Sequence, residues 1–143
     1  MNWKTEAIEK LNRYDAMCQA VRNLPEEIAR LHTEARGIRV AQMDSPSVRN
    51  GGSKRENMLM NNLVCRQELE ILLQQAKSWV KITDRALGSL TPEEKLILHR
   101  MYIFPERNCL DRLSSELGVE QSSIYRKRDK ALQKFTVALY GTP

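Results

Sequence analysis

Apolar residues recur every three or four positions along most of the chain, which places them on one face of an α-helix. The first such segment covers residues 7–21 and the second covers residues 28–38. Between them, Pro25 followed by Glu26 and Glu27 is typical of a helix first turn, so the pattern predicts a second helix or a kink there. Strand-like alternation of apolar and polar residues is missing from the sequence, which therefore predicts an all-α fold.

Residues 43–53 are rich in Asp, Ser, Pro, Asn and Gly, and this composition predicts a mobile loop. A longer helix is expected over residues 55–87, where a main apolar row is accompanied by a flanking one. The main row is Leu69, Leu73, Ala76, Val80, Thr83 and Leu87, and the flanking row is Leu72, Trp79, Ile82 and Ala86. So wide a face is expected when a helix packs against two neighbours or a dimer partner. Residues 1–88 are therefore predicted to form a helical hairpin or bundle that either self-associates or docks a partner. A homodimer is the oligomer expected first.

A new unit is predicted to begin at residue 89. Thr91 offers a capping hydroxyl, Pro92 suits the first helical position, and Glu94 can complete a capping box. The helix that starts here is expected to run to Phe104, because Pro105 then stops it. Residues 89–143 are accordingly predicted to be a separate domain.

A helix-turn-helix pattern lies within this second domain. A short amphipathic helix from Leu110 meets Gly118, which fits a left-handed turn, and a further helix begins after it. The small core expected to fix the angle between these helices consists of Leu113, Leu117, Val119 and Ile124. Ser114 is small enough to let the helices approach closely.

The net charge of +5 on 143 residues permits an anionic partner without demanding one. The densest positive run lies in residues 126–134, where five basic residues accompany one acid, Asp129. Such runs are usually solvated helix faces, but this one directly follows a glycine turn. That context favours a DNA recognition helix whose first half enters the major groove.

The position along this helix predicts the role of each side chain. The residues expected to face bases are Gln121, Ser122, Tyr125 and Arg126. Those expected to contact phosphates are Lys127, Arg128, Lys130 and Lys134, with Arg112 from the preceding helix. The first group should set specificity, and the second should set affinity and salt dependence.

The last third of the chain, residues 89–102 and 110–135, resembles region four of bacterial sigma factors. The run SIYRKRDKAL at residues 123–132, together with the helical N-terminal half, resembles phage late-gene transcription regulators of the ArpU/RinA type. This resemblance implies promoter binding in a phage or prophage programme, with activation through contact to host RNA polymerase.

Other chemistry finds little support in the sequence. Three widely spaced cysteines and two isolated histidines suggest neither a disulfide framework nor a metal site, and a reducing cytoplasm fits best. A nucleophile-and-base cluster or a phosphate-binding glycine loop is not evident, so neither catalysis nor a cofactor is expected. The longest aliphatic runs are too short to span a bilayer, so no membrane association is expected.

Two alternatives stay open. The chain could be a phage DNA-packaging or assembly adaptor, similar to a small terminase subunit, whose helices form a ring and whose DNA contact is weakly specific. A closed ring of many subunits would favour that interpretation, whereas a dimer favours regulation. A purely structural coiled coil would leave the Gly118 turn and its basic helix unexplained.

Overall fold

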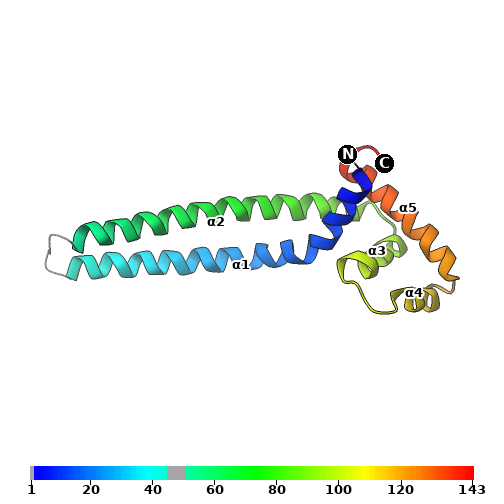
Figure 1. Cartoon of the computed structure of the whole chain (residues 1–143), viewed down its shortest axis with the longest axis horizontal. Coiled ribbons are helices and arrows are strands. Elements are labelled where there is room, and N and C mark those ends of the chain that lie inside the picture. Colours follow the sequence, from blue (N-terminus) through cyan, green and yellow to red (C-terminus); the bar gives the residue numbers. More distant parts are fainter. Residues whose placement is uncertain (1, 45–50) are drawn as a thin grey trace. The chain divides into compact units, whose positions relative to one another are not determined.

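The computed structural model describes residues 2–44 and 51–143, with side chains described for residues 2–41 and 54–143. Within these ranges the chain is helical and contains no strand, which confirms the all-α prediction (Figure 1). The α-helices are α1 (Trp3–Asp44), α2 (Gly51–Gly88), α3 (Pro92–Leu98), α4 (Cys109–Leu117) and α5 (Gln121–Tyr140). A π-helical turn, η1 (His99–Ile103), continues directly from α3.

The first two helices are longer than the sequence indicated. α1 continues through Pro25 as one helix, so the alternative of a second helix is wrong. α1 extends through Asp44 and α2 begins at Gly51, so both ends of the expected loop at residues 43–53 are helical, and residues 45–50 lie outside the described part. Arg55 Nη1 donates to the carbonyl of Ala41 at 2.9 Å, and a cation bonded to a carbonyl near a helix C-terminus stabilises that end.

The chain forms two compact units whose limits differ from the expected boundary between residues 88 and 89. The hairpin unit comprises Gln19–Lys77, and the composite unit combines Met1–Cys18 with Ser78–Pro143. Both α1 and α2 therefore contribute one part to each unit. The sequence placed all of residues 1–88 in the first domain, whereas the start of α1 and the end of α2 belong to the same unit as α3, α4 and α5.

In the hairpin unit, α1 and α2 run antiparallel (Figure 1). The main predicted row of α2 packs against α1, whereas Leu72 of the flanking row is half exposed, so the packed face is narrower than expected. Leu31 and Ala35 of α1 and Leu73 and Ala76 of α2 are buried. Asn62 is also buried, and its side-chain amide donates to the carbonyl of Leu31 at 2.9 Å. Because a buried amide needs a partner, this bond favours one register of the two helices.

In the composite unit, the main core joins residues far apart in sequence. Its buried members are Ala7, Leu11, Ala86, Leu90, Leu98, Ile103, Ala131, Leu132 and Phe135. The Tyr14 hydroxyl donates to the carboxylate of Asp84, and burial together with this bond raises the pKa of Tyr14. The start of α1 and the end of α2 thus complete the core on which α5 lies.

The start of α3 has the predicted capping box. The Thr91 hydroxyl accepts from the Glu94 N–H at 3.3 Å, and the Glu94 carboxylate accepts from the Thr91 N–H at 3.2 Å. The far end differs from the expectation, because α3 ends at Leu98 and the π-helical turn η1 carries the chain to Ile103. The widened turn lets Leu98 and Ile103 both reach the main core.

Candidate nucleic-acid interface

α4, the turn at Gly118 and α5 form a helix-turn-helix. Gly118 adopts the predicted left-handed conformation, with φ of +65°. The Ser114 hydroxyl donates to the carbonyl of Val119, whose N–H returns to the carbonyl of Ser114 at 3.2 Å. Ser114 therefore closes the turn by hydrogen bonding, a role beyond the close approach that its small size suggested.

The predicted small core holds the two helices together. Leu113 and Ile124 are fully buried with Ile97 of α3, and Leu117 and Val119 pack around them. Ile97 and Leu98 are neighbours in sequence but enter different cores of the composite unit. α3 thus anchors the helix-turn-helix on one side and the main core on the other.

The N-terminus of α5 is held by a side chain that the sequence predicted to face DNA. The Glu120 side chain makes no capping hydrogen bond, although its carbonyl accepts from the Ser123 and Ile124 N–H groups. The Gln121 side-chain amide donates to the carboxylate of Asp111 on α4. Gln121 consequently bridges the two helices, and reading a base would require it to exchange this bond.

Tyr125 and Arg128 form a pair on the side of α5. The Arg128 guanidinium lies 5.0 Å from the centroid of the Tyr125 ring and pairs with the Asp129 carboxylate at 3.0 Å. Burial raises the pKa of Tyr102, and the neighbouring Arg128 partly offsets that rise. Tyr125 itself is 41% exposed. Arg128, expected at a phosphate, is already engaged by an aromatic ring and a carboxylate.

Two more of the expected phosphate ligands reach back to the first turn of α3. Lys127 Nζ lies 2.5 Å from the Glu93 carboxylate, and Lys134 Nζ lies 3.0 Å from that of Glu94. Burial alone would raise the pKa of Glu94, but bonds from Lys134 and Thr91 outweigh it and keep the pKa below its ordinary value. Glu94 is therefore ionised at neutral pH, and its pair with Lys134 is a charged one.

The remaining candidates are more exposed. Arg112 pairs with Glu106 at 3.1 Å on the surface, where such a pair adds little stability and is easily exchanged. Ser122, Arg126 and Lys130 are exposed. Among the residues with described side chains, neither Arg126 nor Lys130 enters an ion pair or hydrogen bond with a protein group. These two cations are thus available to an anionic partner.

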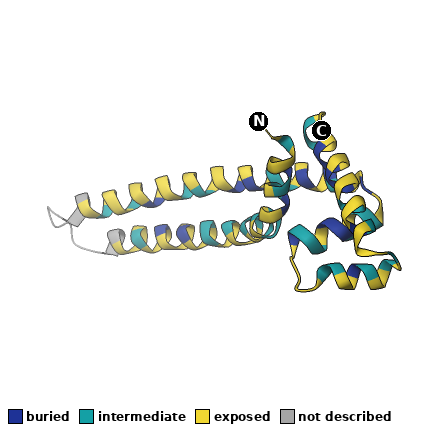
Figure 2. Ribbon diagram, turned by 45° about the vertical axis from the view of Figure 1, so that its right-hand side comes forward, coloured by how far each residue is buried: buried dark blue, intermediate teal, exposed yellow. Residues whose placement is uncertain are grey.

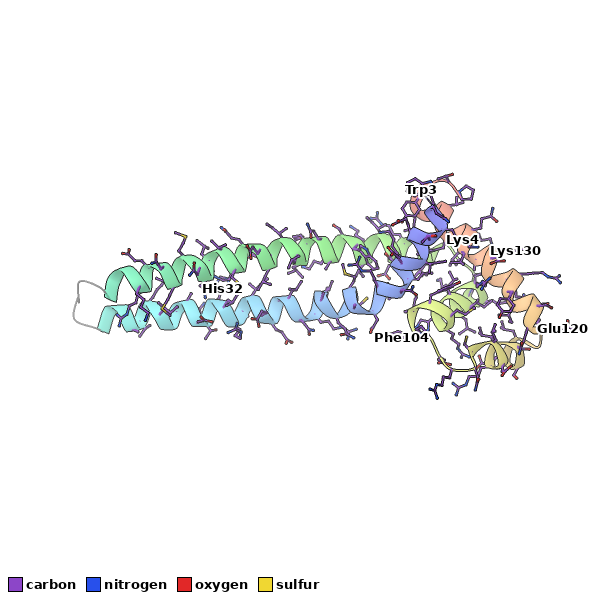
Figure 3. All side chains as sticks on the ribbon, in the orientation of Figure 1. Trp3, Lys4, His32, Phe104, Glu120 and Lys130 are labelled. Carbon is purple, nitrogen blue, oxygen red and sulfur yellow. The ribbon has the colours of Figure 1, made fainter. Side chains whose placement is uncertain are left out.

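The outward face of α5 includes a residue that the sequence analysis overlooked. Arg126, Lys130 and Gln133 follow one another at helical spacing and are all exposed, opposite the buried Ile124 and Phe135. Figure 2 shows that α5 has both buried and exposed positions, and Figure 3 labels Lys130 on this helix. The same 3.6-residue period that locates the buried side would have located Gln133. The structure therefore brings Ser122, Arg126 and Lys130 onto an exposed surface, and Gln133 extends it along the helix.

Within residues whose positions are described, no group of three or more His, Cys, Asp or Glu side chains could hold a metal ion. In the same part of the chain, no helix has the length and apolar character needed to cross a membrane.

Comparison with protein-family models, with curated proteins and with solved structures finds no match to this chain.

Proposed function

We propose that this protein is a non-enzymatic, sequence-specific regulator of transcription that binds double-stranded DNA through α5 and acts in the cytoplasm. Residues 89–102 and 110–135 resemble sigma region four, and residues 123–132 with the helical N-terminal half resemble the ArpU/RinA type. These resemblances support activation of phage or prophage late genes, with host RNA polymerase as a second partner.

One observation supports this proposal above the others. Arg126 and Lys130 are exposed cations without an ion-pair partner among the described side chains, on the first half of a helix that follows a left-handed glycine turn. In a helix-turn-helix, this half of the second helix meets the major groove. Arg126 has the two parallel donors that match guanine, and Lys130 presents a point charge suited to phosphate.

Self-association belongs to the same proposal, because regulators of this architecture bind paired half-sites as dimers. Met60 and Ile71 of α2, in the hairpin unit, are 59% and 60% exposed, and Val64 between them is exposed as well. Helical spacing puts the three on the side away from the buried Leu73. An apolar row left uncovered within one chain supports a homodimer through α2.

The direct test is selection of bound duplexes from a random-sequence pool by the full-length chain, followed by footprinting of the enriched site. The proposal expects enrichment of one sequence, and two half-sites if the protein is a dimer. Binding without enrichment, together with a particle mass of many subunits, would instead favour the packaging adaptor. No binding to any duplex at low salt would contradict both.

A further inference from the structure

α3 and α5 face each other across a cavity of about 180 Å³ in the composite unit. Its lining is almost entirely charged: Glu93, Glu94 and Ile97 come from α3, and Lys127, Lys130 and Lys134 come from α5. The three lysines are three and four residues apart, so they share one side of the helix. Three cations therefore meet two carboxylates here, and Lys130 is the one left without a carboxylate partner among the described residues.

The carboxylate of Glu94 is held in place by the fold. Glu94 is the third residue of α3, and its capping-box bonds with Thr91 fix it at the helix start. Its side chain is only 12% exposed. Glu93 is adjacent in the same first turn. Because α3 is anchored by Ile97 and Leu98 in two cores, neither acid can follow a lysine outward to a DNA backbone.

A lysine that is paired with a carboxylate contributes less to non-specific DNA binding than an unpaired one. Affinity for random duplex comes from cations that replace counterions along the phosphates. To bind a phosphate, Lys127 or Lys134 must first give up its carboxylate, which then lies unpaired near the negatively charged DNA. Lys130 and Arg126 have no carboxylate partner to give up among the described residues, so they bind a phosphate or a base without leaving an acid unpaired.

We infer that Glu93 and Glu94 limit non-specific DNA binding by holding Lys127 and Lys134 against α3, an inference that rests on the proposed DNA-binding function of α5. The two acids reduce the positive charge that α5 offers to phosphates, without touching DNA themselves. Because phosphate contacts are made on every duplex, the acids lower affinity for random sequence and for the preferred site alike, and discrimination between the two is left to the base contact of Arg126.

The test uses the full-length chain with Glu93→Gln and Glu94→Gln. Glutamine at position 94 keeps the capping box, which accepts either residue, and removes only the charge. Glu116→Gln is the matched control, because it removes one negative charge from the same unit at a residue that pairs with Arg100 at 2.7 Å and not with a lysine of α5. Thermal melting verifies that all three variants are folded.

Affinity for a random-sequence duplex is then measured over a series of salt concentrations. Each substitution on α3 should strengthen binding about three-fold and steepen the log–log salt dependence by about 0.9, the effect of one additional phosphate contact. Glu116→Gln should change the slope little. Adding Lys127→Ala should abolish the gain of Glu93→Gln, yet alter the unsubstituted protein only slightly.

The salt concentration that elutes each protein from immobilised heparin gives a second readout that needs no DNA. The two α3 variants should elute from heparin at higher salt than Glu116→Gln. If they do so but no variant binds duplex DNA, Glu93 and Glu94 limit the binding of polyanions in general, and the proposed DNA-binding function is rejected. If the three variants behave alike on both duplex and heparin, the inference is overturned whether or not the protein binds DNA.

Discussion

The indole ring of Trp3 lies against the phenol ring of Tyr140, with their centroids 4.8 Å apart. The first of these residues opens α1, and the second closes α5. Lys4, labelled beside Trp3 in Figure 3, pairs with Asp129 of α5 at 3.7 Å. The start of the chain is therefore part of the unit that contains the proposed recognition helix.

This packing makes Leu11 a support for the DNA-binding helix. Leu11 is fully buried in the core that also contains Phe135. Leu11→Ala should lower the free energy of unfolding by about 2–5 kcal/mol, the usual cost of such a cavity. Asn12→Ala, at the exposed next position, is the control and should change it little. Denaturant unfolding measures both, and equal midpoints would contradict the role given to Leu11.

The turn before α5 depends on a glycine for reasons of backbone geometry. Gly118 has φ of +65°, and a Cβ placed there would meet nothing within 4 Å. Gly118→Ala should therefore destabilise the protein through backbone strain alone, by about 1–2 kcal/mol. Gly37 lies within α1 with equally open surroundings, so Gly37→Ala should stabilise it by about 0.5–1 kcal/mol. The melting temperature should therefore fall for Gly118→Ala and rise for Gly37→Ala. A change in the same direction for both variants would contradict this explanation.

Neighbouring leucines of α2 provide a test of the hairpin unit. Leu73 is 8% exposed, whereas Leu72 is half exposed. Leu73→Asp buries an unpaired charge and should cost several kcal/mol, on the order of 4. Leu72→Asp should cost much less, because its carboxylate remains in water. Unchanged melting of Leu73→Asp would show that this face of α2 is not the packed one.

The exposed row of α2 can be tested separately for self-association. Ile71→Glu should leave the helical signal in circular dichroism unchanged while reducing the particle mass in light scattering to that of one chain. Glu70→Gln, at the preceding exposed position, should leave the mass as it is. An unsubstituted protein that is already monomeric at high concentration would reject the homodimer and favour docking of another partner.

Local patterns of the sequence were enough to predict most of the helices and the turn. The Thr91 capping box, the glycine turn and the core around Leu113 all depend on residues within a few positions of one another, and the structure confirms them. The length of α1 was underestimated at Pro25, because packing on one face of a helix can outweigh one missing hydrogen bond.

Long-range pairings were not predictable in the same way. Ala7 and Leu11 mark an apolar face, but nothing local indicates that it packs against α5 and not only against α2. Lys127 and Lys134 look like free cations in the sequence because their partners on α3 lie 34 and 40 positions earlier. Gln133, by contrast, was overlooked although the helical period alone marks it as outward-facing.

The proposed division of roles on α5 leads to a prediction in which specificity and charge separate. Arg126→Ala should weaken binding to the selected site by about 1–3 kcal/mol and binding to random duplex much less, because a contact to a base is lost. Lys130→Ala should weaken both similarly and make the log–log salt slope shallower by about one, because one phosphate contact is lost. Both side chains are exposed and unpaired among the described residues, so neither change should disturb folding. Titrations of full-length protein with both duplexes measure the contrast. If both substitutions leave both affinities unchanged, α5 is not the helix that reads DNA.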